Sequence, residues 1–198
     1  MATVGRFAAV VLAAGAGSRF GGGKLLADYA GAPLLHAALA AARAAPVQSI
    51  TLVTGVDAEA VAACAAGFDP AVRVVHAADH AEGMAASLRA GIASLEPGLD
   101  GVFVFLGDMP RVPHAVLAPL AAAVDAGAPA AAPVFAGRRG NPVVLGRTLF
   151  GDVAALRGDV GARTVLQGLG ARLALLEAPD DGVLFDIDVR EDLSRARP

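Results

Sequence analysis

Residues 12–24, with the sequence LAAGAGSRFGGGK, combine five glycines with two cationic side chains, Arg19 and Lys24. Glycine adopts positive φ angles and lets a ligand approach the backbone closely. Successive backbone N–H groups in such a loop form a concave binding site for an anion. We therefore predict that this loop binds the triphosphate of a nucleotide, with a flexible glycine-rich turn as the alternative.

Two familiar phosphate-binding motifs do not fit this spacing. A P-loop has Ser or Thr directly after Gly-Lys, but here Leu25 follows Lys24, and Ser18 stands at the position of the first glycine. A dinucleotide-binding GxGxxG motif begins well at Gly15, yet Phe20 stands at the position of its third glycine. The loop therefore belongs to neither class.

A carboxylate follows the most strand-like run of the chain, in the segment LGDMP at residues 106–110. A carboxylate at the end of a buried strand is costly to desolvate unless a cation compensates it. We therefore predict that Asp108 is a ligand of a phosphate-bound Mg²⁺ ion. The alternative is that Asp108 caps the next turn.

The segment FDIDVREDL, residues 185–193, supplies further carboxylates. Asp186 and Asp188 alternate along an expected strand end, so their side chains should point to opposite faces. Only one of them then faces the same metal as Asp108, and the residues alone leave open which. Asp192 falls in the first turn of the last helix, where we expect it to act as a cap.

Two segments that contain arginine each allow two interpretations. RRG at residues 138–140 is either a solvated hairpin turn or a contact from Arg138 to an acceptor phosphate, because arginine binds phosphate bidentately. GDVGAR at residues 158–163 is either a plain loop or a second anion site before a helix. The scattered histidines are expected to be structural, with His80 the exception, and the single cysteine, Cys64, to be a buried helical residue.

Apolar runs alternate with helical stretches along the chain. We predict strands at 7–12, 49–54, 72–76, 102–106, 130–135, 142–145 and 173–177. We predict helices at 33–45, 57–66 with Asp57 as its cap, 83–95 and 113–125, two short helices after residue 145, and a last helix from residue 191. Strands that are apolar on both faces imply an α/β fold: a three-layer, open, mostly parallel sheet with helices on both faces. Ligands then bind at the carboxyl ends of the strands.

Composition narrows the classes of protein further. The 198 residues are 56% hydrophobic and 18% charged, with a net charge of −3, which suits one folded domain spanning residues 1–198 and excludes disorder. No apolar run is long enough to span a membrane, and no stripe of Lys and Arg indicates nucleic-acid binding. The first six residues lack the apolar core of a signal peptide, so we expect a cytoplasmic protein.

Six motifs occur in order between residues 7 and 193: LAAGxxxRFGxxK, GMAASLRAGI, LGDMP, RRGNPVVL, GDVGAR and DIDVREDL. Together they resemble the MobA/MocA-type nucleotidyltransferases, and within these the molybdenum cofactor cytidylyltransferases. The resemblance implies a Rossmann-like nucleotidyltransferase fold that transfers CMP from CTP to the terminal phosphate of molybdopterin and releases pyrophosphate. Mg²⁺ is the implied cofactor. Phe20 stands where the family more commonly has Met, which keeps an apolar anchor.

The resemblance also implies roles for single residues. The implied nucleotide-binding residues are Ala13, Ala14, Gly15, Arg19, Lys24, Gly83 and Ser87. The implied catalytic residues are Arg19, Lys24 and Asp108. Asp108 and Asp188 would hold the metal, and Asn141 would lie toward the acceptor together with Arg138. Because an acceptor phosphate is itself the nucleophile, no general base is required.

Two other functions stay open at this point. One is nucleotidyl transfer with another pair of substrates, such as GTP with molybdopterin, or a sugar or alcohol phosphate as acceptor. The other is a protein that binds the cofactor and hands it to an apo-enzyme. Ser87 in GMAASL favours cytidine, and the intact set of Arg19, Lys24, Asp108 and Asp188 favours catalysis. The expected partners are small molecules, and the resemblance implies a molybdoenzyme or its chaperone as the recipient of the product.

Overall fold

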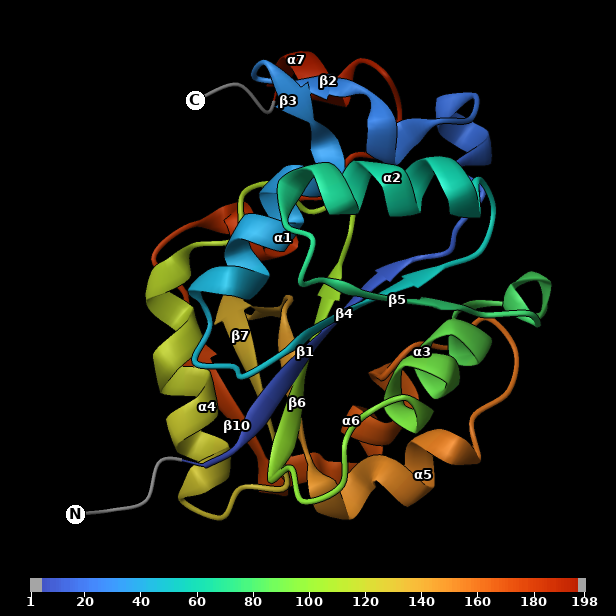
Figure 1. Ribbon diagram of the computed structural model, residues 1–198. Coiled ribbons are helices and arrows are strands. Elements are labelled where there is room, and N and C mark those ends of the chain that lie inside the picture. The colour runs from blue at the N-terminus through green and yellow to red at the C-terminus, as the bar shows by residue number, and fades with distance from the viewer. Residues whose placement is uncertain (1–4, 196–198) are drawn as a thin grey trace.

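The computed structural model describes residues 5–195 (Figure 1). The prediction that the chain begins without a signal peptide falls mainly on residues 1–4, which lie outside the described residues. Within the described residues, no helix is long and apolar enough to cross a membrane.

One eight-stranded sheet forms the centre of the molecule, in the order β10-β7-β9-β6-β1-β4-β5, with β8 paired to β7 (Figure 1). Its strands are β1 (Phe7–Ala13), β4 (Ile50–Thr54), β5 (Arg73–His76), β6 (Gly101–Leu106), β7 (Ala130–Phe135), β8 (Arg138–Arg139), β9 (Val143–Gly146) and β10 (Leu173–Glu177). A separate ribbon pairs β2 (Asp28–Tyr29) with β3 (Ala32–Pro33). The seven strands predicted by their residue ranges are all present, and their ends differ from the prediction by at most one residue.

The sheet is mostly parallel, as predicted, and β9 explains the exception. β9 runs antiparallel to both of its neighbours, β6 and β7, whereas β1, β4, β5 and β6 are mutually parallel. Only residues 136–142 connect β7 to β9. A parallel crossover needs about a dozen residues or more, so this short connection returns the chain in the opposite direction.

Helices cover the sheet on both faces. They are α1 (Leu34–Ala44), α2 (Ala58–Phe68), α3 (Met84–Ala93), α4 (Leu117–Asp125), α5 (Phe150–Ala154), α6 (Arg163–Leu169) and α7 (Asp192–Arg195). Short 3-10 helices occupy Ser18–Phe20, Lys24–Leu26, His80–Glu82, His114–Val116, Arg147–Leu149, Gly170–Arg172 and Asp181–Leu184. Helices α1, α2 and α4 pack on one face and α3, α5 and α6 on the other, which confirms the three-layer fold (Figure 1).

Strand β1 shows why both faces need a cover. All seven of its residues are buried. Its side chains alternate, so Ala9 and Val11 join the core under α1, α2 and α4, while Val10 and Leu12 join the core under α3, α5 and α6. A strand of this kind is stable only between two helical layers.

Two helix starts differ from the prediction. Asp57 precedes α2, but its backbone is left-handed with φ 57°, and its side chain accepts no hydrogen bond from the helix. Capping side chains sit on an extended backbone, which explains why Asp57 does not act as one. The predicted helix at 113–125 begins as the 3-10 turn His114–Val116 before continuing as α4.

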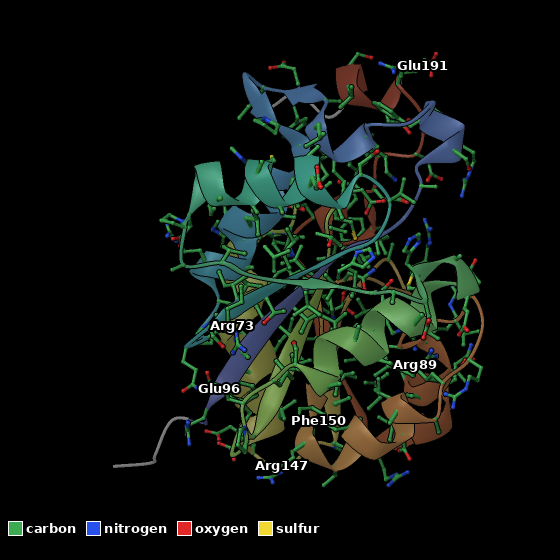
Figure 2. The ribbon with its side chains drawn as sticks, turned by 45° about the vertical axis from the view of Figure 1, so that its right-hand side comes forward. Arg73, Arg89, Glu96, Arg147, Phe150 and Glu191 are labelled. Atoms are coloured by element: carbon green, nitrogen blue, oxygen red, sulfur yellow. The ribbon has the colours of Figure 1, made fainter. Side chains whose placement is uncertain are left out.

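Ion pairs and hydrogen bonds fix α3 beside α5. The Arg89 guanidinium on α3 donates to the carbonyl oxygen of Leu156 (2.7 Å) and pairs with Glu82 (3.2 Å). Arg73 on β5 pairs with Glu96 after α3 (3.2 Å). Figure 2 shows Arg89 on the side of the molecule formed by α3 and α5, above Phe150. The Arg89–Glu82 pair thus ties α3 to the turn before its N-terminus, and the Arg73–Glu96 pair ties the chain after its C-terminus to β5.

Gly91→Ala tests how tightly α3 packs on the sheet. A Cβ atom at Gly91 would lie 2.6 Å from Val10 Cγ1 and 3.0 Å from Val53 Cγ2. We expect this substitution to lower the free energy of unfolding by about 1–3 kcal/mol, although alanine is the better helix former. The matched control is Gly67→Ala on α2, where a Cβ meets nothing within 4 Å and should be neutral or stabilising by up to about 1 kcal/mol. Urea unfolding of both variants measures the difference, and equal effects would contradict close packing at Gly91.

Candidate active site

The glycine-rich loop after β1 is ordered by its own backbone. Gly17, Gly21, Gly22 and Gly23 have positive φ angles of 55°, 91°, 88° and 63°. The carbonyl oxygen of Gly17 accepts hydrogen bonds from the N–H groups of Phe20 (3.0 Å), Gly21 (3.2 Å) and Gly22 (3.2 Å). Side chains with a Cβ rarely adopt these angles, so the glycines are what allows the loop to close on itself.

Phe20 anchors this loop to two distant parts of the chain. Its buried ring packs with Leu34 at the start of α1 and with Ile187 near the C-terminus. The Arg190 guanidinium lies 4.7 Å from the centre of the same ring. The apolar role expected of Phe20 is therefore present, and it holds the two neighbouring cations of the loop near the C-terminal segment.

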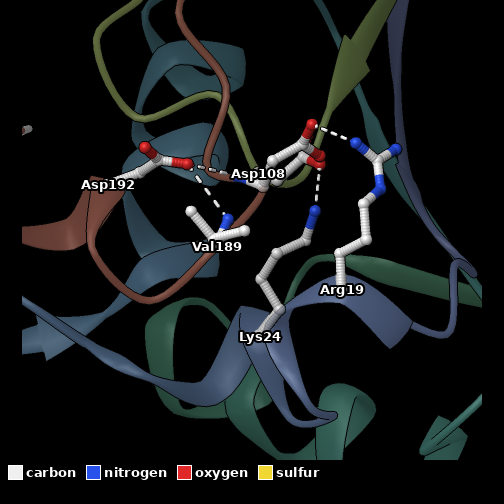
Figure 3. A network of polar contacts seen from close by, with 6 residues as sticks. Arg19, Lys24, Asp108, Val189 and Asp192 are labelled. Carbon is white, nitrogen blue, oxygen red and sulfur yellow. Dashed lines mark hydrogen bonds and ion pairs between the residues drawn. The ribbon is translucent and has the colours of Figure 1, made fainter.

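Each cation of the loop is paired with a carboxylate (Figure 3). Lys24 Nζ lies 2.6 Å from Asp108 Oδ2, and Arg19 Nη1 lies 2.6 Å from Asp188 Oδ2. The side chains of Lys24 and Asp108 are only 14% and 22% exposed, whereas those of Arg19 and Asp188 are 75% and 41% exposed. The structure thus brings together the four charged residues that the sequence singled out.

The C-terminal carboxylates do not lie on a strand. Residues 185–188 form an irregular segment, so the argument that Asp186 and Asp188 must point to opposite faces is wrong. Burial raises the pKa of the Asp186 carboxyl, and the negative charges of Asp108 and Asp188 raise this pKa further, while Lys24 lowers it. All three carboxylates therefore act on one another.

Asp192 and Asp108 hold this segment through backbone contacts. Asp192 Oδ2 accepts hydrogen bonds from the N–H groups of Asp188 and Val189, both at 3.0 Å (Figure 3). The N–H of Ile187 donates to the carbonyl oxygen of Asp108 (3.0 Å). The loop after β6 and the C-terminal segment are thus directly connected.

The charges of the site suit a divalent metal ion. Asp108, Asp186 and Asp188 outnumber Lys24 and Arg19, and after burial the negative charges of Asp108 and Asp188 are what raise the pKa of Asp186. In the part of the chain that the structure describes, no group of three or more His, Cys, Asp or Glu side chains is preformed as a metal site. Mg²⁺ is usually held by one or two carboxylates together with water and substrate phosphates, so it does not require such a group. The residues present fit an ion that arrives with a nucleotide.

A cavity of about 220 Å³ adjoins these ion pairs at the carboxyl edge of the sheet. Its lining includes residues Ala14, Gly15, His80, Gly83, Ser87 and Asp108. Ser87 is 4% exposed, and His80 lies at the site as the sequence suggested. The Ala13 side chain packs in the core under α1 and α2, on the other side of the sheet, so it does not line this cavity.

The segment GDVGAR covers the start of α3. Gly83 has φ 112°, and a Cβ there would lie 2.7 Å from the carbonyl carbon of Gly158. The N–H of Met84 donates to Asp159 Oδ1 (3.3 Å), and the N–H of Ala85 donates to the Gly158 carbonyl oxygen (3.2 Å). A carboxylate therefore caps the start of α3. The second anion site is predicted at the helix that follows GDVGAR, which is α6, and it stays a prediction. Sequence reasoning missed Asp159, because no local pattern links it to a helix that begins 75 residues earlier.

A larger cavity, of about 400 Å³, lies next to the first and shares Leu12, Met84, Leu106 and Asp159 with it. Asn141 lines this cavity together with Arg139. Arg138 lines a separate cavity with Phe135 and Phe185.

Adjacent residues of a strand point to opposite faces, and Arg138 and Arg139 both lie on β8. The structure therefore corrects the expected pairing: it brings Arg139, and not Arg138, to Asn141. The N–H of Asn141 donates to the carbonyl oxygen of Val183 (2.8 Å), which fixes the hairpin against the C-terminal part of the chain.

The family model and the related sequences agree on one protein family. Residues 9–175 match the MobA-like NTP transferase domain. The nicotine blue oxidoreductase of Paenarthrobacter nicotinovorans is 31% identical over 194 residues, which cover 94% of each chain. The purine catabolism protein PucB of Bacillus subtilis (strain 168) is 36% identical over 128 residues, or 60% of this chain and 58% of PucB.

Solved structures agree over nearly the whole chain. Rv0371c of Mycobacterium tuberculosis H37Rv is 33% identical with a TM-score of 0.85, covering 98% of both chains. A complex of Rv0371c with manganese gives 30% identity and a TM-score of 0.79, over 96% of this chain and 97% of that one. A nucleotidyl transferase of Methanothermobacter thermautotroptrophicus is 27% identical with a TM-score of 0.81, over 97% and 96% of the two chains. The matched domain and these relatives show that the chain belongs to the MobA-like nucleotidyltransferase family.

Proposed function

We propose that this nucleotidyltransferase transfers CMP from CTP to the terminal phosphate of molybdopterin and releases pyrophosphate. The observation that carries the proposal is the pairing of Lys24 with Asp108 and of Arg19 with Asp188 beside a cavity lined by Ser87. The site combines cations that can bind phosphates, carboxylates that can bind a metal ion, and an adjoining cavity that can hold a base. The product would be delivered to a molybdoenzyme or its chaperone.

The chemistry follows from these charges. An oxygen of the acceptor phosphate attacks the α-phosphorus of CTP and forms a new P–O bond. The bond from the α-phosphorus to the bridging oxygen of the β-phosphate breaks, and pyrophosphate leaves with the electron pair. Lys24 and Arg19 exchange their carboxylate partners for phosphate oxygens and stabilise the charge of the transition state. No proton has to be removed from the attacking phosphate oxygen.

Asp108 and Asp188 would hold Mg²⁺ once the two cations have moved to the phosphates, with Asp186 nearby. When bound, the ion would neutralise phosphate charge and orient the triphosphate. The manganese complex of Rv0371c supports a divalent metal in this fold.

Base selection would come from the cavity at the start of α3. Ala14 and Gly15 present backbone groups there, and the buried Ser87 offers one hydroxyl as donor or acceptor. Gly83 leaves no side chain between the base and the backbone of the covering loop. These features suit a nucleobase, and the proposed preference for CTP over GTP rests on the resemblance of the GMAASL motif that contains Ser87.

The 31% identity to nicotine blue oxidoreductase over nearly the whole chain favours a second candidate, the oxidoreductase activity for which that relative is named. The two candidates separate in one pair of assays. Pyrophosphate release from CTP with molybdopterin supports the transferase. A change in the visible absorbance of nicotine blue with NADH or NADPH, and no pyrophosphate release, supports the oxidoreductase.

Ser87→Ala tests the base pocket. Isothermal titration of CTP, GTP, ATP and UTP with Mg²⁺ should show that the wild-type protein prefers CTP. Because the variant loses one hydrogen bond to the base, its preference for CTP over GTP should fall by about tenfold. An unchanged preference would remove Ser87 from the base pocket, and a wild-type preference for GTP would replace cytidylyl by guanylyl transfer.

Asp108→Asn tests the metal site. Without its negative charge, Mg²⁺-dependent nucleotide binding should weaken and turnover should fall by at least about 100-fold. The control is Asp181→Asn, which removes an exposed carboxylate paired with Arg111 outside the cleft. A chelator should reduce the wild-type protein to the level of the Asp108 variant. Nearly full activity of Asp108→Asn would mean that Asp108 only ties down Lys24.

Lys24→Met tests whether this cation acts in the transition state. We expect kcat to fall by about 100- to 1,000-fold, while the Kd for CTP measured by titration rises much less. The physical reason is that negative charge accumulates on the phosphates as the bond to pyrophosphate breaks. Equal losses in kcat and in affinity would show that Lys24 only holds the ground state.

A further inference from the structure

The larger cavity carries two arginines on different structural elements. Arg139 comes from β8, and Arg163 is the first residue of α6. Both line the cavity of about 400 Å³ that contains Asn141. Much of the remaining wall is apolar and includes Val104 and Leu166.

No carboxylate neutralises either of these two arginines, whereas five arginines among residues 5–195 have such a partner. Arg19, Arg43, Arg73, Arg89 and Arg111 each pair with a carboxylate. Among residues 5–195, no ion pair involves the two arginines of the cavity.

Their positive charges also repel each other. Burial lowers the pKa of the half-buried Arg139 guanidinium, and the positive charge of Arg163 lowers this pKa further. The carboxylate in the same lining, Asp159, accepts the N–H of Met84 and is exposed. Two like charges around one cavity are unfavourable until an anion enters between them.

We infer that this cavity binds a phosphate group of the acceptor between Arg139 and Arg163, with the body of the acceptor against the apolar wall. The inference rests on the proposed function in so far as it takes the bound anion to be part of the second substrate. Guanidinium groups are planar forks that bind phosphate bidentately, and two of them match a dianion. Asn141 adds an amide that binds a neutral polar atom beside it.

The position of the cavity suits an acceptor. It shares Leu12 and Leu106 with the cavity assigned to the nucleotide, and Leu106 lies two residues before Asp108. An acceptor held here therefore borders the ion pairs where the α-phosphate of CTP would lie.

The hairpin that carries Arg139 is rigidly placed. Gly140 follows it, and a Cβ at Gly140 would collide with the carbonyl oxygen of Val183. The N–H of Gly140 donates to the carbonyl oxygen of Pro133 (2.9 Å). Because the backbone is fixed on both sides, Arg139 is directed into the cavity and its neighbour Arg138 away from it.

Inorganic phosphate is the probe for this site, titrated into the full chain without nucleotide or metal and followed by calorimetry. Arg139→Gln and Arg163→Gln should each weaken phosphate binding by about tenfold or more. Arg138→Gln is the matched comparison on the same short strand, and it should bind phosphate like the wild-type protein. A loss with Arg138→Gln that equals the loss with Arg139→Gln would overturn the inference.

A second set of variants distinguishes phosphate bound at the glycine-rich loop from phosphate bound between Arg139 and Arg163. The double variant Arg19→Gln, Lys24→Gln should keep the binding that depends on Arg139. If that double variant abolishes phosphate binding while Arg139→Gln and Arg163→Gln leave it intact, the inference fails. Arg139→Lys keeps the charge but not the fork, so its affinity should lie between those of the wild-type protein and Arg139→Gln. This variant provides the answer if the glutamine variant does not fold.

Measurements of turnover show whether the inferred phosphate site or the proposed function fails. With CTP, Mg²⁺ and molybdopterin, Arg139→Gln should raise the KM for molybdopterin about tenfold and leave the KM for CTP unchanged. If the wild-type protein does not turn over molybdopterin, the proposed function fails, while phosphate binding that depends on Arg139 still supports the site. If turnover proceeds and neither arginine affects phosphate binding or the KM for molybdopterin, the inference fails and the proposed function stands.

Discussion

The charge balance at the carboxyl edge of the sheet is the constraint on which the arrangement of this site depends. Lys24 and Asp108 are both largely shielded from water, and a shielded charge is stable only when it is paired. In the described structure the pairs Lys24–Asp108 and Arg19–Asp188 satisfy this requirement without a ligand. In the proposed complex, the negative phosphates would pair with Lys24 and Arg19, and the positive metal ion would pair with Asp108 and Asp188. Each charged side chain would then keep a partner of opposite charge. The proposed exchange of partners therefore leaves no shielded charge without a counter-charge.

Apolar packing decides where these charges meet. Phe20 of the loop, Leu34 of α1 and Ile187 of the C-terminal segment form one small cluster, although they come from three separate parts of the chain. The pairing of β1 with β6 places Leu12 opposite Leu106, so the loop after one strand faces the loop after the other. Apolar contacts therefore place the loops that carry the polar residues, and the ion pairs form between loops that are already positioned.

Two adjoining cavities suit a protein that must hold two substrates at once. The smaller one has backbone groups and a hydroxyl next to the ion pairs, and the larger one has an apolar wall with two unpaired arginines. Asp159 borders both and caps α3, so the loop that carries it forms a common wall.

The sequence by itself determined the order of strands and helices, the three-layer sheet and the residues Arg19, Lys24 and Asp108, while it left open the choice between Asp186 and Asp188. These follow from local patterns: apolar periodicity specifies the buried faces, and glycines or carboxylates placed directly after buried strands mark the edge where parallel strands end. The family-specific roles, such as that of Ser87, came from the resemblance of the motifs.

Only the tertiary structure decided which of two neighbouring residues in the sequence faces the site. It also decided which distant segments of the chain meet there. Arg139 rather than Arg138 reaches Asn141, because the register of β8 on β7 sets the faces of both residues. Asp186 joins the other carboxylates because its segment is irregular rather than a strand. Asp159 caps a helix that begins 75 residues before it. The contacts of Asp186 and Asp159 join residues far apart in the chain, and no pattern of neighbouring residues encodes such contacts.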